Sequence, residues 1–98
     1  MAHDARAIPA LTQALADKDW MTRQAAVKAL GALGNPQVIA VLAPLLDDAD
    51  WAMRAEAARA LGHVGDPQIV PLLAPLVADP AWSVRQAAMR ALRPLVKI

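Results

Sequence analysis

Apolar residues recur along this chain at spacings of three and four, and they do not alternate with polar residues as they would in a half-buried strand. Helical geometry places such residues on one face, so the pattern predicts helices. Six helical segments follow, which pair as a first and a second helix in each of three units. The predicted first helices cover 5–16, 36–47 and 67–78, and the second helices cover 20–33, 51–64 and 82–95.

The same pattern returns every 31 residues. Trp20, Trp51 and Trp82 are separated by this interval, and each begins a predicted second helix. A register held over the whole chain indicates structural repeats, each of which buries its apolar face against its neighbours. Further positions keep the register: Arg23/Arg54/Arg85, Ala29/Ala60/Ala91, Leu30/Leu61/Leu92 and Asp17/Asp48/Asp79.

Residues at the predicted boundaries agree with this division. Gly34 and Gly65 follow the first two second helices, where glycine accepts the left-handed conformation that ends a helix. Asn35 and Asp66 come next and are suited to capping the helix that follows. Three prolines fall inside the predicted first helices, where each removes a backbone donor, so we expect bends or looser turns at Pro44, Pro71 and Pro75.

The sequence of the third unit, Asp79-Pro80-Ala81-Trp82-Ser83-Val84-Arg85 followed by Ala87-Ala88 and Ala91-Leu92, resembles the HEAT-like repeats known from phycobilisome lyases. The resemblance extends over essentially the whole chain. It implies an all-α fold, a right-handed α-solenoid of three antiparallel helical hairpins. We therefore expect one domain over 1–98, with repeats at approximately 4–34, 35–65 and 66–98.

The second helices carry the candidate binding surface. In HEAT-like solenoids these helices usually line the concave face, so the resemblance implies that this surface is presented to a partner. Trp side chains lie on it beside a column of basic residues. The alternatives are that the Trp residues only pack between repeats and that the basic column is only solvated. The candidate partner-binding residues are Trp20, Gln24, Lys28, Trp51, Arg59, Trp82, Gln86 and Arg90.

A second set of repeated charges is interpreted as structural. Each repeated Arg lies at the edge of the predicted core and can reach an Asp of its own or a neighbouring unit. The guanidinium group matches a carboxylate with two parallel hydrogen bonds. The resemblance implies a ladder of this kind between repeats, formed by Asp17, Arg23, Asp48, Arg54, Asp79 and Arg85.

Composition argues against catalysis and against several ligands. The chain has no cysteine, which excludes disulfides and zinc held by thiolates. Its one serine is Ser83, its one glutamate is Glu56, and neither histidine is followed by Glu. We therefore expect no enzyme, no cofactor and no metal, with a weak divalent-cation site at Asp47, Asp48 and Asp50 as the remaining alternative.

The two ends of the predicted stack differ. The first helix has small or polar residues at Ala7, Ala10, Gln13 and Ala14, which is typical of a cap. Beyond the last helix, apolar side chains have no following repeat to cover them. They either fold back as a lid or join a second copy in a symmetric dimer, or the chain derives from a longer solenoid whose next repeat covers them. These candidate self-association residues are Leu95, Val96 and Ile98.

These observations favour a non-catalytic protein–protein interaction module, a small scaffold or adaptor that binds a protein or peptide through its second helices. The alternatives are a nucleic-acid-binding module and an accessory subunit of a lyase-type enzyme. A formal net charge of +1 and no dense basic stripe disfavour nucleic acid. No run is long and apolar enough to cross a bilayer, so no membrane association is expected and a cytoplasmic location is predicted.

Overall fold

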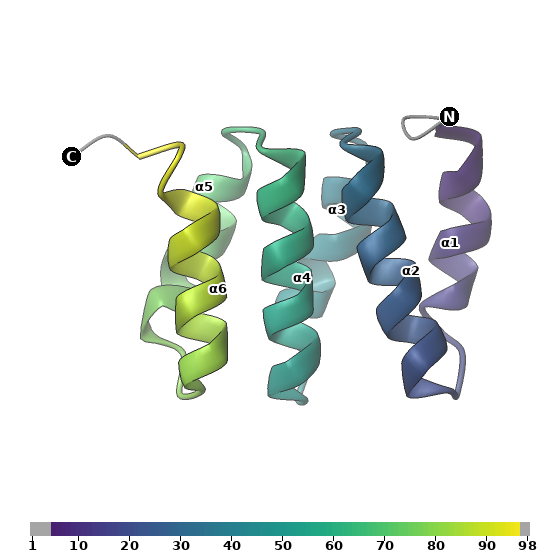
Figure 1. Ribbon diagram of the computed structural model, residues 1–98, viewed down its shortest axis with the longest axis horizontal. Coiled ribbons are helices and arrows are strands. Elements are labelled where there is room, and N and C mark those ends of the chain that lie inside the picture. The colour runs from purple at the N-terminus through teal and green to yellow at the C-terminus, as the bar shows by residue number, and fades with distance from the viewer. Residues whose placement is uncertain (1–4, 97–98) are drawn as a thin grey trace.

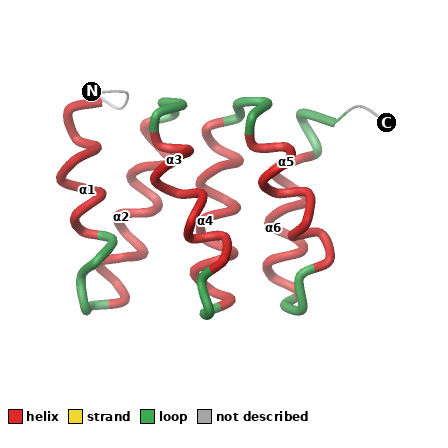
Figure 2. The backbone as a smooth tube through the Cα atoms, turned by 180° about the vertical axis from the view of Figure 1, so that it is seen from behind, coloured by secondary structure: helices red, strands yellow, loops and turns green. Residues whose placement is uncertain are grey.

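The computed structural model describes residues 5–96 as a row of helices in two layers (Figures 1 and 2). The second helices α2 (Trp20–Leu33), α4 (Trp51–Val64) and α6 (Trp82–Leu92) form one layer. The other layer consists of 3-10 helix η1 (Ala5–Ala7) with α1 (Ile8–Ala14), α3 (Val38–Leu42) with η2 (Ala43–Asp47), and α5 (Ile69–Leu73) with η3 (Ala74–Ala78). The described residues thus confirm the all-α solenoid of three helical hairpins.

The prolines account for the shape of the first helices. The α-helix changes to a 3-10 helix at Ala43 and again at Ala74, one residue before Pro44 and Pro75. Proline cannot donate the backbone hydrogen bond that an α-helix needs at that point. Pro71 behaves differently because it lies in the first turn of α5, where backbone N–H groups have no partner within the helix. The first helices therefore change to the 3-10 form at Pro44 and Pro75, as expected of looser turns, but not at Pro71.

Local capping fixes where α2 and α4 begin and end. Asp19 and Asp50 accept hydrogen bonds from the backbone N–H of the residues two positions later, which satisfies free donors at the starts of α2 and α4. Gly34 and Gly65 have φ angles of 64° and 68°, as predicted for glycines that end a helix. The third second helix is shorter than predicted: α6 ends at Leu92 rather than at 95. Pro94 accounts for this, because it has no backbone N–H to continue the helical hydrogen bonds, although Arg93 itself keeps helical angles (φ −52°, ψ −44°).

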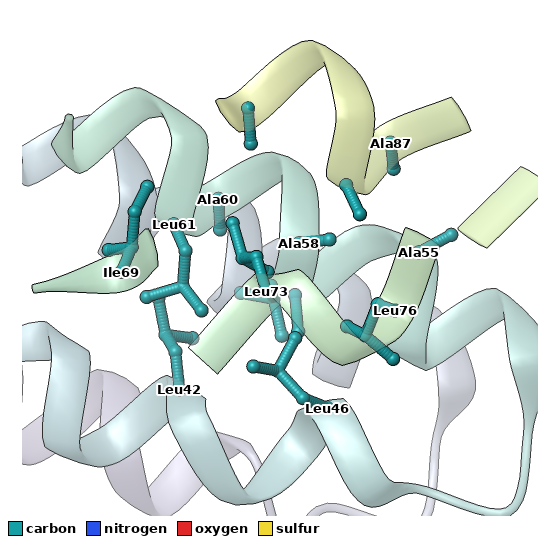
Figure 3. Close-up of a cluster of buried hydrophobic side chains, with 14 of the residues drawn as sticks. Leu42, Leu46, Ala55, Ala58, Ala60, Leu61, Ile69, Leu73, Leu76 and Ala87 are labelled. Carbon is teal, nitrogen blue, oxygen red and sulfur yellow. The ribbon is translucent and has the colours of Figure 1, made fainter. Parts of the chain in front are cut away.

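The core is built mainly from leucine, isoleucine, valine and alanine, with Met53, between the two layers (Figure 3). Leu42, Leu61 and Leu73 are fully buried there and come from three different helices. Alanines on α4 and α6 allow these helices to lie close together, where larger side chains would hold them apart. Burial is unequal along the row, because α4 contributes seven buried residues and α1 contributes none.

Candidate functional site

Two adjoining grooves lie on the layer of second helices. The first, about 390 Å³ in volume, is lined by residues of α2 and α4: Lys28, Ala32, Glu56, Arg59, Ala60 and His63. The second, about 300 Å³, lies between α4 and α6 and is lined by Arg59, Gly62, His63, Ala87, Arg90 and Ala91. The grooves share Arg59 and His63, so α4 forms the ridge between them. Small residues line much of both grooves, while the long side chains around them are mostly basic.

A buried carboxylate holds Arg59 in place. Glu56 is 4% exposed and lies one helical turn before Arg59 on α4. Its Oε1 accepts hydrogen bonds from Arg59 Nη2 at 3.1 Å and from Gln24 Nε2 at 3.2 Å. A carboxylate buried to this extent needs such partners, because removing its charge from water is costly. Arg59 therefore keeps a preferred orientation with about half of its side chain exposed.

His63 extends the polar edge of both grooves. Its Nδ1 lies 3.1 Å from the backbone oxygen of Arg59, one turn earlier in α4. A carbonyl oxygen can only accept, so Nδ1 donates and carries the ring proton in the neutral form. In this tautomer Nε2 is left as a hydrogen-bond acceptor.

The candidate binding residues fall into two groups. Lys28, Arg59 and Arg90 occupy equivalent positions on successive helices, and all three line the grooves. The tryptophans do not line them. Trp51 and Trp82 are 52% and 64% exposed at the starts of α4 and α6.

Trp20 is half-buried, and it packs against the core. The guanidinium carbon of Arg23 lies 5.6 Å from the centroid of its ring, within the range of a cation–π interaction. The three tryptophans therefore differ: Trp20 packs against the core, whereas Trp51 and Trp82 are open to solvent.

The two glutamines also differ. Gln24 is half-buried at the contact between α2 and α4, where it donates to Glu56. The equivalent position on α4 is Ala55, which is 1% exposed. Gln86 is half-buried on α6. Gln24 therefore lies at the contact between two second helices, Ala55 is buried, and none of the three positions is fully open to solvent.

One step of the predicted Asp–Arg ladder is closed by a pair of side chains. Arg54 donates from Nε to Asp79 Oδ2 at 2.9 Å and from Nη2 to Asp79 Oδ1 at 3.1 Å, which joins consecutive repeats. The hydrogen bond from Arg54 lowers the pKa of the Asp79 carboxyl below its ordinary value, although burial opposes this shift. The same bond raises the pKa of Arg54.

The other members of this set serve local geometry. Arg23 Nη1 donates to the backbone oxygen of Asp17 at 2.6 Å, and Arg85 Nη1 donates to that of Asp79 at the same distance. Arg54 does likewise with the backbone oxygen of Asp48. The carboxylates of all three aspartates accept from the N–H two residues later, which fixes the turn between first and second helix.

The sequence-based prediction did not include Glu56 or His63 in the site. The signal was present, because Glu56 stands where the other repeats have Ala25 and Ala87. A charged residue that departs from an apolar repeat position marks a local specialisation. Within residues 5–96, no group of three or more His, Cys, Asp or Glu side chains could hold a metal ion, and no helix is long and apolar enough to cross a membrane.

Stacked helical hairpins with a continuous core define the class of α-solenoid repeat proteins. Within that class, the model of the family described as HEAT repeats matches residues 1–51 and 41–95. These two matches span nearly the whole chain, so it belongs to the HEAT repeat family. HEAT repeats generally mediate protein–protein interactions, and proteins built from them are typically non-catalytic scaffolds. No curated protein matches the sequence.

Proposed function

We propose that this chain is a non-catalytic scaffold or adaptor module that binds an acidic segment of a partner protein along the grooves of α2, α4 and α6. The observation that carries the proposal is the line of Lys28, Arg59 and Arg90, one cation from each second helix, over two adjoining grooves. Opposing charges across an interface set orientation and suppress wrong partners.

The architecture of the grooves supports this choice. Gly62, Ala87 and Ala91 line the second groove, and their small side chains do not block a main chain or a carboxylate from reaching Arg59 and Arg90 at its edges. Arg59 is held by Glu56 before any ligand arrives, so less conformational entropy is lost when it binds. The exposed rings of Trp51 and Trp82 add apolar anchors beside the basic line, and tryptophan is among the residues that contribute most to interfaces.

A random peptide library displayed on phage, selected against the full chain, tests the proposal. Selected peptides should be rich in Asp and Glu. When synthesised, they should bind the Arg90→Gln chain about tenfold or more weakly, as expected when one charge-assisted contact is lost. Lys18→Gln is the matched control, because Lys18 is an exposed cation in the loop before α2. Selection of neutral peptides, or equal losses in both variants, would contradict the proposal.

The salt dependence of DNA binding separates a nucleic-acid ligand from a protein ligand. Binding of duplex DNA through phosphates weakens steeply with salt, in proportion to the number of phosphates contacted. The chain carries a net charge of only +1, and Glu56 offsets part of the charge over the grooves. We therefore expect no salt-dependent shift of labelled duplex DNA at micromolar protein. Three narrower assignments remain predictions: the phycobilisome-lyase-type subfamily, the alternative role as an accessory subunit of a lyase-type enzyme, and the cytoplasmic location.

A symmetric homodimer through the outer side of α6 is a second candidate. An apolar groove of about 210 Å³ there is lined by Met89, Leu92, Arg93 and Val96. Met89 and Val96 are 52% and 41% exposed, whereas Leu95 packs against the core. Ile98, also predicted to take part, lies outside the described residues. Sedimentation equilibrium should give a dimer that Met89→Lys dissociates, and a strict monomer at about 1 mM would exclude it.

A further inference from the structure

Second helices approach one another most closely where one carries glycine. A Cβ atom on Gly31 would lie 2.8 Å from the Cα and Cβ atoms of Ala60 on the next second helix. A Cβ atom on Gly62 would lie 2.8 Å from the Cβ atom of Ala91. Contacts this short do not occur between real side chains. The interface between successive second helices is therefore one interface used twice, with glycine on one side and alanine on the other.

The 31-residue register extends this interface to both sides of the stack. On the outer side of α2, Ala29 is the equivalent of Ala60 and Ala91. Unlike them, it has no glycine of another second helix packed against it within the described residues. On the outer side of α6, the position equivalent to Gly31 and Gly62 is Arg93. The two sides are therefore not complementary to each other.

The small and apolar side chains on the outer side of α2 are exposed, because no second helix of the described residues packs against them. Ala25 is exposed and Ala29 half-exposed, although their equivalents on α6, Ala87 and Ala91, are 3% and 7% exposed. Met21 is 66% exposed at the same edge. Together they form an apolar groove of about 610 Å³ between α1 and α2, lined by Leu11, Ala14, Met21, Thr22, Ala25, Ala26 and Ala29.

We propose that this groove, here called the α2 edge, binds the second helix of a HEAT-type hairpin from another molecule that carries glycine opposite Ala29. The geometry it offers is the one that α4 offers to Gly31 and α6 offers to Gly62. Continuity with these interfaces specifies the occupant: a helix of the same kind, at the same close spacing. This surface is separate from the basic grooves, which lie between α2, α4 and α6.

A second copy of the chain does not satisfy this requirement. Its Gly31 and Gly62 already face its own Ala60 and Ala91, and the side it leaves open presents Arg93. A Cβ atom alone would be too close at this position, and an arginine would also place a charge against the apolar α2 edge. Arg93 thus prevents head-to-tail stacking of identical copies into an open filament.

Two substitutions at the end of α6 should allow one copy of the full chain to bind the α2 edge of another copy. Arg93→Gly with Pro94→His reproduces the Gly62-His63 sequence of the middle repeat on α6. In sedimentation velocity, this double variant should associate with increasing concentration from about 10 µM to about 1 mM, about tenfold or more tightly than the unaltered chain. Arg93→Ala with Pro94→His should associate less than the glycine version, because alanine restores the short Cβ contact.

Matched variants test where this association occurs. Ala29→Arg or Ala25→Arg, added to the double variant, should abolish it. Ala40→Arg should not, because Ala40 is an exposed alanine on α3, away from the α2 edge. If circular dichroism shows that the double variant has lost helix, the single variant Arg93→Gly is measured with the same additions. A folded glycine variant that stays monomeric, or association that survives both α2-edge changes, overturns the proposal.

Discussion

Arg54 joins two repeats through a single guanidinium group. It pairs with Asp79 of the next repeat and also donates to the backbone oxygens of Asp48 and Ala49. The Asp79 carboxylate in turn accepts from the N–H of Ala81, before the start of α6. Two loops and one inter-repeat contact thus depend on the same side chain.

Replacing this side chain should lower stability more than replacing its counterpart in the first repeat. Arg54→Gln leaves the buried Asp79 carboxylate without its partner, so we expect Tm to fall by about 5–10 °C. Arg23→Gln removes a bond to a backbone oxygen and a contact with Trp20, and should lower Tm by about half as much or less. Thermal unfolding followed by circular dichroism measures both. Equal losses would show that the inter-repeat pair is not the important contact.

The same pair makes stability depend on pH. The folded-state pKa of Asp79 is lowered by Arg54 relative to its ordinary value of 3.8, so folding favours the ionised carboxylate. The resulting stabilisation is complete well above pH 3.8 and is lost as the pH falls through the lower folded-state value. Urea unfolding from about pH 6 to about pH 2.5 should show this loss.

Asp79→Asn should be less stable at neutral pH and should lose less stability on acidification than the unaltered chain. Asp47→Asn is the control, because Asp47 is an exposed carboxylate at the end of η2. It should keep the original pH dependence. An Asp79→Asn chain that loses as much stability as the unaltered chain over the acidic range would contradict this assignment.

Successive second helices pack with a glycine of one against an alanine of the next, so the distance between the helices depends on both residues of each pair. Gly62→Ala should destabilise the fold by about 1–2 kcal/mol, because overpacking against Ala91 outweighs the better helix propensity of alanine. Ala91→Gly alone should cost about 1 kcal/mol from helix propensity.

The double variant Gly62→Ala/Ala91→Gly exchanges the two residues and removes the short contact. It should be more stable than the sum of the single changes predicts, by about 1–2 kcal/mol. Urea unfolding of the four chains provides this double-mutant cycle. Strict additivity would mean that α4 and α6 separate easily, and that the glycine is not required for their close approach.

Across the whole molecule, stability should follow position in the row. α4 has second helices on both sides and seven buried residues, whereas α1 has no buried residue and lies at one side of the stack. In a repeat stack each unit is stabilised by its nearest neighbours, so the outer units open first.

Amide hydrogen exchange measured by NMR should show this gradient. We expect the slowest amides in α4, exchanging about 100-fold or more slowly than those of α1, with α6 between them. Addition of a ligand for the α2 edge should slow exchange in α1 and α2. Uniform protection along the row would instead indicate that all three repeats unfold as one cooperative unit.

Local sequence signals are sufficient to predict the order of the helices and most of their boundaries within residues 5–96. These features depend on local signals that can be read one segment at a time: the helical spacing of apolar residues, glycine at 34 and 65, and proline at 44 and 75. The alignment of Lys28, Arg59 and Arg90 was equally accessible, because a fixed repeat places equivalent residues on equivalent faces.

The contacts that these side chains make depend instead on how the helices pack against one another. Glu56 reaches Gln24 across 32 positions of sequence, and Arg54 reaches Asp79 across 25, so neither pair follows from helical spacing within one segment. The close approach at Gly62 depends on the distance between two helices, which is set by the packing of all the side chains between them. Periodicity fixes which face a residue occupies, while packing determines its neighbour and whether a groove remains beside it.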